Sequence, residues 1–391
     1  MKSISQELQY RASLSKILPV IFGFFIMGFV DLIGVASNYV KMDFSLSDSL
    51  VNLISLSCFF WFLIVSIPTG LLMNRIGRKK TVLFSYVFTL LGLLIPCISY
   101  SFVFVLVAFA FIGIGNAIIQ VALNPLVTNV VSKEKLTGTL TLGQFTKAIS
   151  SFLGPIVTSW FSTFFLDWKY IFPVFALITL LSGFWLWVTP ISQECTDRKN
   201  AVSFASTISL LKDKRMLFMF IGILVLVGVD VGMNITLPKY LMEKCNIALD
   251  DAILGNSVYF LVRTISAFIG GVLLMKYSEI TFFRYSALIA LIGLVSLIFS
   301  SSIVTIILSV IAFGVGYANL FAIIFSVTLK SMPEKANECS SLLIVGVSGG
   351  AIITPILGIS TDLFKTQIAA IIILLLIWLY IVWMTRIVKA N

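Results

Sequence analysis

The chain has 391 residues, of which 59% are hydrophobic and 11% are charged, whereas soluble domains carry roughly a quarter charged residues. Its formal net charge is +10, and it contains no histidine. This composition excludes an ordinary soluble domain and indicates a polytopic membrane protein. Because the basic residues lie between apolar runs rather than on one globular face, no nucleic acid partner is expected.

Apolar runs bounded by charged or turn residues predict twelve membrane-spanning helices. The runs are close to the roughly 20 residues that a helix needs to cross a bilayer, and helices satisfy every backbone group within the lipid. The predicted fold class is therefore an all-α membrane protein in contact with the lipid bilayer. The predicted helices lie near residues 17–40, 51–73, 81–99, 102–131, 139–165, 169–190, 216–242, 252–275, 281–300, 302–329, 338–363 and 367–385.

The distribution of Lys and Arg predicts the orientation of these helices. With the N-terminus placed in the cytoplasm, the cytoplasmic segments carry 20 of the 27 Lys and Arg residues. Cytoplasmic loops of membrane proteins carry such an excess, so both termini are predicted to be cytoplasmic. The outer segments carry five cations, namely Lys41, Lys169, Lys239, Lys244 and Lys365.

Internal similarity predicts a duplicated unit of six helices. Parallel repeats of this kind, with a substrate site between the halves, are one design of secondary transporters. The predicted organisation is an N-terminal half over residues 1–190, a cytoplasmic linker over 191–214 and a C-terminal half over 215–391. The landmarks that recur at an offset of 199 to 201 residues are Asp31 and Asp230, Gly70 and Gly270, Gly113 and Gly314, and Pro155 and Pro355.

Four charged residues lie inside the predicted helices. A charge in the bilayer core is costly, so it usually faces a partner or a water-filled path. Asp31 and Asp230 are the candidates for proton coupling, because the chain has no histidine to carry the proton. Lys147 and Arg263 are candidates for binding the ligand or compensating charge. The alternative is two ion pairs that only hold helices together.

Polar side chains share one face of the fourth predicted helix. Asn116, Gln120 and Asn124 are spaced four residues apart, while the equivalent region of the tenth helix presents Tyr317 and Phe321. Amides can bind sugar hydroxyls and rings can pack on the C–H faces of a sugar. Interhelical hydrogen bonds and core packing are the alternatives. The polar ring predicted around a central cavity also includes Asn38, Gln144 and Asn234.

A basic loop between the second and third helices carries a recognisable pattern. The segment resembles the Gly-x-Leu-x-Asp-Arg-x-Gly-Arg-Lys/Arg-Lys/Arg signature of the major facilitator superfamily, with Asn74 in place of the usual Asp. The resemblance implies a cytoplasmic gate, although a positive-inside turn without a gating role has the same charges. The residues assigned to this gate loop are Gly70, Asn74, Arg75, Gly77, Arg78 and Lys79.

Three further segments resemble the fucose, galactose and glucose:proton symporter branch of that superfamily. They are Gln120-Val-Ala-Leu-Asn124-Pro125, Gly228-Val-Asp230-Val-Gly232 with Leu237-Pro238-x-Tyr240, and Ile344 to Gly350 with Pro355. The resemblance implies import of a monosaccharide together with protons. Fucose permease-like members carry a carboxylate at the position of Gln120, and their helix-one acid lies about one turn later than Asp31. Proton coupling would therefore move to Asp31 and Asp230.

The sequence predicts a monomeric secondary transporter of the bacterial inner membrane that imports a monosaccharide or similar polar solute. A transporter of sugar acids or other anions that uses Lys147 and Arg263 is the nearest alternative, followed by a drug or metabolite exporter. No enzymatic activity, metal site or cofactor is expected, because the five cysteines are scattered and no histidine is present. The coupling ion is expected to be H⁺, with Na⁺ as the alternative.

Overall fold

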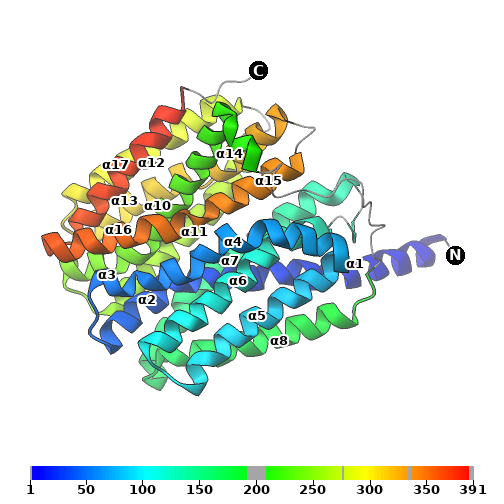
Figure 1. Ribbon diagram of the computed structural model, residues 1–391, viewed down its shortest axis with the longest axis horizontal. Coiled ribbons are helices and arrows are strands. Elements are labelled where there is room, and N and C mark those ends of the chain that lie inside the picture. The colour runs from blue at the N-terminus through cyan, green and yellow to red at the C-terminus, as the bar shows by residue number, and fades with distance from the viewer. Residues whose placement is uncertain are drawn as a thin grey trace.

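The computed structural model describes residues 2–127, 129–131, 133–191, 208–274, 277–332 and 336–386 (Figure 1). Every regular element within these ranges is a helix. Eleven helical segments there are long and apolar enough to cross a membrane. The twelfth predicted span corresponds to the apolar helix α17, Ile368–Met384, which has 17 residues and is shorter than the others.

The helices fall into two sets along the chain. The N-terminal set is α1 (Lys2–Met27), η1 (Gly28–Asp31), α2 (Leu32–Asp43), α3 (Asp48–Val51), α4 (Leu53–Ile76), α5 (Arg78–Ile98), α6 (Phe102–Val127), α7 (Lys133–Phe165), η2 (Trp168–Tyr170) and α8 (Ile171–Val188). The predicted linker 191–214 lies mostly outside the described residues, which resume at residue 208.

The C-terminal set follows that gap. Its elements are η4 (Leu210–Lys212), α10 (Lys214–Cys245), α11 (Leu249–Leu273), α12 (Glu279–Phe299), α13 (Ile303–Tyr317), α14 (Leu320–Ser331), α15 (Ala336–Val345), η6 (Gly346–Ser348), α16 (Gly349–Phe364) and α17. In Figure 1 this set lies above the N-terminal set.

Local sequence determines where several helices begin and end. The Asp213 carboxylate accepts the Met216 backbone N–H at 2.9 Å and caps α10, which ends at the left-handed Asn246. Between α4 and α5, Gly77 has φ of 85°, a conformation that favours glycine. The chain can therefore reverse within one residue at the basic loop.

Three helices that were predicted to be continuous are interrupted. The first span breaks at η1, the tenth between α13 and α14, and the eleventh at η6. A side-chain amide satisfies a backbone carbonyl at the first of these breaks, where Asn116 of α6 donates to the Met27 carbonyl at 2.8 Å. At the break between α13 and α14, Asn319 instead donates to the Ser266 carbonyl of α11 at 3.0 Å. Such replacement bonds allow irregular backbone at membrane depth.

Glycine contacts between neighbouring helices repeat in the two sets. A methyl group on Gly92 of α5 would lie 2.6 Å from the Ala108 carbonyl oxygen of α6. One on Gly293 of α12 would lie 2.8 Å from the Ser309 carbonyl oxygen of α13. The paired residues are 201 positions apart in each case. Small residues let helix backbones approach closely, so the same close packing joins α5 to α6 and α12 to α13.

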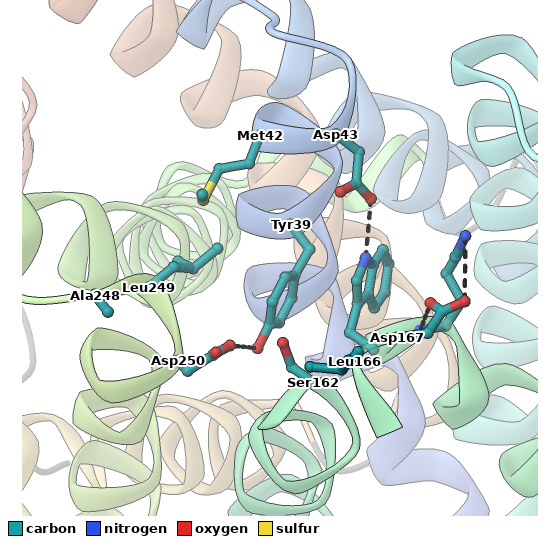
Figure 2. Close-up of a pocket in the computed structure, with 11 residues that line it drawn as sticks. Tyr39, Met42, Asp43, Ser162, Leu166, Asp167, Ala248, Leu249 and Asp250 are labelled. Atoms are coloured by element: carbon teal, nitrogen blue, oxygen red, sulfur yellow. Dashed lines mark hydrogen bonds and ion pairs between the residues drawn. The ribbon is translucent and has the colours of Figure 1, made fainter. Parts of the chain in front are cut away.

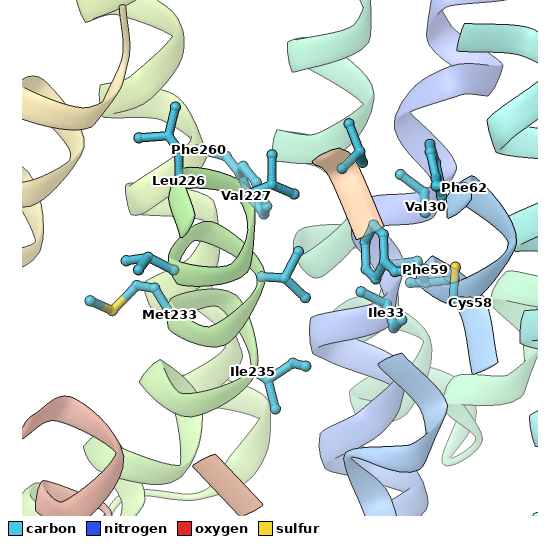
Figure 3. Close-up of a cluster of buried hydrophobic side chains, with 14 of the residues drawn as sticks. Val30, Ile33, Cys58, Phe59, Phe62, Leu226, Val227, Met233, Ile235 and Phe260 are labelled. Carbon is cyan, nitrogen blue, oxygen red and sulfur yellow. The ribbon is translucent and has the colours of Figure 1, made fainter. Parts of the chain in front are cut away.

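Buried apolar side chains fill the contact between the two sets. Figure 3 shows Val30, Ile33 and Phe59 of the N-terminal set facing Val227 and Ile235 of α10. These side chains are at most 8% exposed. The interface is therefore a packed core, and the polar groups described below interrupt it.

Candidate functional site

Side-chain bonds between the two sets gather at the end of the bundle that contains α3, here called the α3 end. Asp48 is only 4% exposed, and its Oδ1 accepts Lys41 Nζ at 2.7 Å and Lys239 Nζ at 2.8 Å. Its Oδ2 accepts Gln367 Nε2 at 2.7 Å. One carboxylate thus binds one cation of its own set and two groups of the other.

Further bonds close the same end. Asp362 of α16 accepts the backbone N–H groups of Asp48 at 2.8 Å and Ser49 at 2.7 Å. Asn52 donates to the Thr354 carbonyl at 2.7 Å, and Tyr39 donates to the Asp250 carboxylate. Every one of these bonds joins the N-terminal set to the C-terminal set.

The sequence did not predict this network. Lys239 was counted among the cations of the outer segments, but its side chain is 7% exposed within α10. Its partner Asp48 lies 191 positions earlier in the chain. The available signal was a lysine inside the apolar run 216–242, which requires a partner in the same way as Lys147 and Arg263.

A cavity of about 430 Å³ lies beside this network (Figure 2). Tyr39, Asp43 and Trp168 of the N-terminal set line it together with Asp250 of α11. Asp43 accepts Trp168 Nε1 at 2.9 Å and the hydroxyl of Tyr100 at 2.5 Å. Burial and the neighbouring Asp43 carboxylate raise the pKa of the Tyr100 hydroxyl, which keeps it a hydrogen-bond donor.

The predicted amide stripe of α6 forms a hydrogen-bonded ladder. Gln120 Nε2 donates to Asn116 Oδ1 at 2.8 Å, and Asn124 Nδ2 donates to the Gln120 carbonyl at 3.5 Å. Asn116 is 4% exposed and holds the Met27 carbonyl, whereas Gln120 and Asn124 are half-buried. The ladder therefore reaches from the break in the first span to two amides that retain some exposure.

Two asparagines of the predicted polar ring bond across the two sets. Asn38 donates to the Ile235 carbonyl at 3.3 Å, and Asn234 donates to the Asp31 carbonyl at 3.1 Å. Asn234 Oδ1 also accepts Asn256 Nδ2 at 2.7 Å. Gln144 is exposed on α7. Asn38 and Asn234 thus hold the two sets together near Asp31.

Asp230 and Arg263 form a compact charged pair. Arg263 donates from one nitrogen to both Asp230 oxygens, at 2.5 and 2.6 Å, and Tyr259 donates to Asp230 Oδ1 at 2.6 Å. The guanidinium carbon lies 5.2 Å from the ring centre of Phe260 and 5.5 Å from that of Tyr317. The positive charge of Arg263 is therefore neutralised by Asp230 and surrounded by rings.

Asp31 has a different environment. Its Oδ2 accepts the Ser151 hydroxyl at 2.5 Å. Among the described residues, neither Asp31 nor Lys147 forms an ion pair within 4.0 Å. Of the two ion pairs that the sequence left open as an alternative, the structure forms the one between Asp230 and Arg263.

Aromatic residues of the tenth span flank the helix break. Tyr317 ends α13 and is 5% exposed, while Phe321 of α14 is half-buried. The Phe321 ring stacks with that of Phe325 at a centroid distance of 5.9 Å. The predicted aromatic stripe is thus divided between two helices.

The basic loop binds the ends of helices within its own set. Arg78 donates to the Pro125 carbonyl at 3.1 Å and to Asn129 Oδ1 at 2.7 Å, at the end of α6. Lys79 donates to the Trp187 and Thr189 carbonyls at 2.9 and 2.8 Å, at the end of α8. Basic groups at helix C-termini are favourable. Arg75 is exposed, Gly70 has open space around it, and the side chain of Asn74 lies outside what the structure describes.

Comparison with known proteins agrees with this architecture. The model of the Major Facilitator Superfamily matches residues 20–355. The glucose/galactose transporter of Brucella abortus is 25% identical over 364 residues, which cover 88% of this chain and 87% of that protein. The probable nitrate transporter NarT of Staphylococcus epidermidis is 22% identical and covers 80% and 79% of the two chains.

Among solved structures, the fucose:proton symporter FucP of E. coli has a TM-score of 0.72 at 17% identity, with 97% of this chain and 100% of that chain covered. This likeness concerns the fold. The resemblance to the glucose/galactose branch is confirmed by the relatives of that name. The chain therefore belongs to the major facilitator superfamily and is a multi-pass inner-membrane transporter, not an enzyme.

Proposed function

We propose that this chain imports a neutral monosaccharide together with protons by alternating access. In this proposal both termini are cytoplasmic, twelve helices form two six-helix repeats over residues 1–190 and 215–391, and the monomer is the working unit. The glucose/galactose transporter of B. abortus supports the substrate class, and FucP, a fucose:proton symporter, supports the coupling.

The observation that carries the proposal is the amide ladder of α6. Gln120 and Asn124 present amide groups that can donate to and accept from sugar hydroxyls, and they stay half-buried beside an otherwise apolar core. The half-buried ring of Phe321 supplies an apolar surface. A polyhydroxylated ring matches this combination.

The neutralised Arg263 favours a neutral substrate over an anion. An anion would have to compete with the Asp230 carboxylate, which binds the guanidinium at 2.5 and 2.6 Å. Lys147 keeps the anion alternative open, since it has no ion-pair partner among the described residues, and NarT is named a nitrate transporter. Sugar acids and nitrate therefore belong in the substrate test.

Asp31 is the better candidate for the coupling proton. Its carboxylate is held by one hydroxyl, whereas Asp230 is held by Arg263 and Tyr259. Asp31 therefore lacks the cationic partner that Asp230 has among the described residues. With the N-terminus inside, the first span runs outward to α3. The bonds of the α3 end then close the outer side.

The test uses purified protein in proteoliposomes that contain a pH-sensitive dye. Addition of glucose, galactose or fucose is expected to acidify the lumen, because protons enter with the sugar. If only gluconate, glucuronate or nitrate acidifies the lumen, the substrate is an anion and not a neutral sugar. Labelled sugar uptake without any pH change would retain the substrate class and remove proton coupling.

A further inference from the structure

Two seams join the two sets of helices at equivalent places of the repeat. In the first, here called the α4 seam, α16 packs against α3 and α4, and in the second, here called the α11 seam, α11 packs against α7 and α2. Pro155 of α7 and Pro355 of α16 are 200 residues apart, and so are Gly70 of α4 and Gly270 of α11. The bonds of one seam can therefore be compared with those at matched positions of the other.

Charged groups close the α3 end of the α4 seam. The ion pair between Asp48 and Lys239 is buried on both sides. Asp362 of α16 accepts the backbone N–H groups of Asp48 and Ser49. A methyl group on Gly358 of α16 would lie only 2.5 Å from the Asp48 carbonyl oxygen, so the backbones are in close contact. Hydrogen bonds to charged groups are stronger than neutral ones, and this seam therefore resists separation.

The matched positions of the α11 seam carry a neutral donor. Tyr39 lies 200 residues before Lys239, and Asp250 lies 202 residues after Asp48. Tyr39 donates to the Asp250 carboxylate, so one hydrogen bond takes the place of the ion pair. Beside it, the Ser159 hydroxyl donates to the Asp250 carbonyl at 3.1 Å. Among the described residues, no ion pair joins α11 to α2 or α7.

The cavity of Figure 2 lies where the α11 seam reaches the α3 end. Ser162 of α7, Tyr39 of α2 and Asp250 of α11 all line it, so both sides of the seam contribute to its wall. Its volume of about 430 Å³ falls within the range of about 300 to 1,000 Å³ that small-molecule sites have. Parting of the bond between Tyr39 and Asp250 would extend the cavity between α2 and α11.

The lining of this cavity suits a neutral molecule with several hydroxyl groups. Asp43 Oδ1 and Asp250 Oδ2 accept no hydrogen bond from any described residue, so each can accept one from a sugar hydroxyl. The carboxylates of Asp43, Asp167 and Asp250 outnumber the single cation of the lining, Lys169. The resulting negative potential disfavours anions at this entrance.

We infer that the α11 seam is the entrance through which the sugar passes between the two sets from the α3 end. Tyr39 and Asp250 form its gate, and the cavity is the vestibule that receives the sugar. The α4 seam, which is held by ion pairs, separates later. This inference rests on the transport function proposed above and adds the route of the substrate and two residues that control it.

The test compares one buried cysteine in each seam. Ser257→Cys and Asn52→Cys are made separately in a background without natural cysteines. Both native side chains are buried and donate to a carbonyl across their seam, Ser257 to that of Phe152 at 3.2 Å and Asn52 to that of Thr354 at 2.7 Å. Labelling of the purified protein with N-ethylmaleimide reports how often each seam opens.

The positions of the two cysteines make the comparison strict. Asn52 lies four residues after Asp48, whereas Ser257 lies seven residues after Asp250, so Asn52 is nearer the α3 end. If both seams opened equally, Asn52→Cys would be labelled at least as fast as Ser257→Cys. We expect Ser257→Cys to be labelled about tenfold faster, a difference of roughly one hydrogen bond.

Tyr39→Phe tests the gate directly. The variant loses the hydroxyl but keeps the ring, which stacks on Trp168 at a centroid distance of 5.0 Å, so the fold should be retained. Labelling of Ser257→Cys should accelerate about tenfold, the loss of roughly one hydrogen bond, while that of Asn52→Cys stays the same. Tyr100→Phe is the matched control, because the Tyr100 hydroxyl donates to Asp43 within the N-terminal set.

A third cysteine tests the vestibule. Ala248→Cys replaces an exposed residue of the cavity lining, and Ser47→Cys replaces an exposed residue 201 positions earlier, at the α4 seam. Saturating glucose, galactose or fucose, whichever is transported, should slow the labelling of Ala248→Cys and leave that of Ser47→Cys unchanged. Protection by gluconate or nitrate but not by a neutral sugar would overturn the neutral character of the vestibule.

Two results would overturn the entrance. One is labelling of Asn52→Cys as fast as that of Ser257→Cys, and the other is an equal effect of Tyr39→Phe and Tyr100→Phe on Ser257→Cys. Should Tyr39→Phe fail to fold, the first comparison still decides. Because these labelling rates need no sugar, failure of the sugar panel leaves them intact. Conversely, proton-coupled sugar uptake with equal labelling of both seams would retain the proposed function and remove the entrance.

Discussion

Asp48 at the α3 end and Asp31 at the break in the first span are both acids at the contact between the two sets, but their partners differ. Asp48 binds two lysines and a glutamine, and it is 4% exposed. Asp31 is half-buried and binds one serine hydroxyl. The two lysines hold the Asp48 carboxylate in place, whereas the Asp31 carboxylate has no cationic partner among the described residues. The first arrangement suits a latch and the second a coupling site.

The largest effect is expected from Asp31→Asn, which removes the exchangeable charge. Uphill sugar uptake should be lost, while exchange of internal for external sugar continues, because exchange needs no net ion movement. Uptake against a gradient and counterflow in the same proteoliposomes measure the two activities. Asp251→Asn, an exposed acid in the first turn of α11, is the control and should keep both. Full concentrative uptake by Asp31→Asn would exclude Asp31 from coupling.

Asp48→Asn tests whether the bonds of Asp48 hold the α3 end closed. It leaves Lys239 buried without its carboxylate, which typically costs about 3–5 kcal/mol, so the α3 end should open. A cysteine at Ser257, which bonds across to the Phe152 carbonyl at 3.2 Å, reports opening through maleimide labelling in a background without natural cysteines. The double variant Asp48→Leu with Lys239→Met should label more slowly than Asp48→Asn. Equally slow labelling of Asp48→Asn, of the double variant and of the protein with both residues unchanged would contradict a latch.

Gln120→Leu separates substrate binding from both acids. It removes one half-buried amide of the proposed sugar site at nearly constant volume, so we expect KM for the sugar to rise about tenfold, which corresponds to about 1.4 kcal/mol. Thr179→Val is the control, because its hydroxyl bonds to the Phe175 carbonyl within α8. An unchanged KM would return the ladder to a purely structural role.

Lys169→Met should have the smallest effect. Lys169 pairs with Asp167 at 3.4 Å, and their side chains are 36% and 38% exposed. Exposed pairs contribute between about 0 and 1 kcal/mol, so the unfolding midpoint should hardly change. A fall in the unfolding midpoint as large as that caused by Asp48→Asn would mean that solvent exposure does not distinguish the Asp48 pairs from the other ion pairs at the α3 end.

Hydrophobic periodicity and the distribution of charge predicted most of the helices and the polar face of α6, because both patterns depend on residues that are close in sequence. The spacing of Asn116, Gln120 and Asn124 places them on one face, and the structure links them. The pair between Asp48 and Lys239 could not be predicted in this way, because 191 positions separate the partners. The roles of the predicted site residues in binding and coupling remain predictions.

The interruptions of the helices were missed for a related reason. Hydropathy reports whether a segment suits lipid, and Gly28 or Gly346 changes that average very little. The first span is interrupted where Gly28 lies in close contact with α7, and where Asn116 of α6 donates a hydrogen bond to the Met27 carbonyl. Both depend on helices that are distant in the sequence.

The repeated glycine contacts of α5 with α6 and of α12 with α13 have a consequence for mutational tolerance. Any side chain at Gly92 or Gly293 would meet backbone atoms of the neighbouring helix, which cannot rotate away as a flexible side chain could. Gly115 and Gly316 make the corresponding contacts from the other helix of each pair. A saturation scan of the gene should therefore show intolerant positions in couples 201 codons apart, which would report the packing that the two sets share.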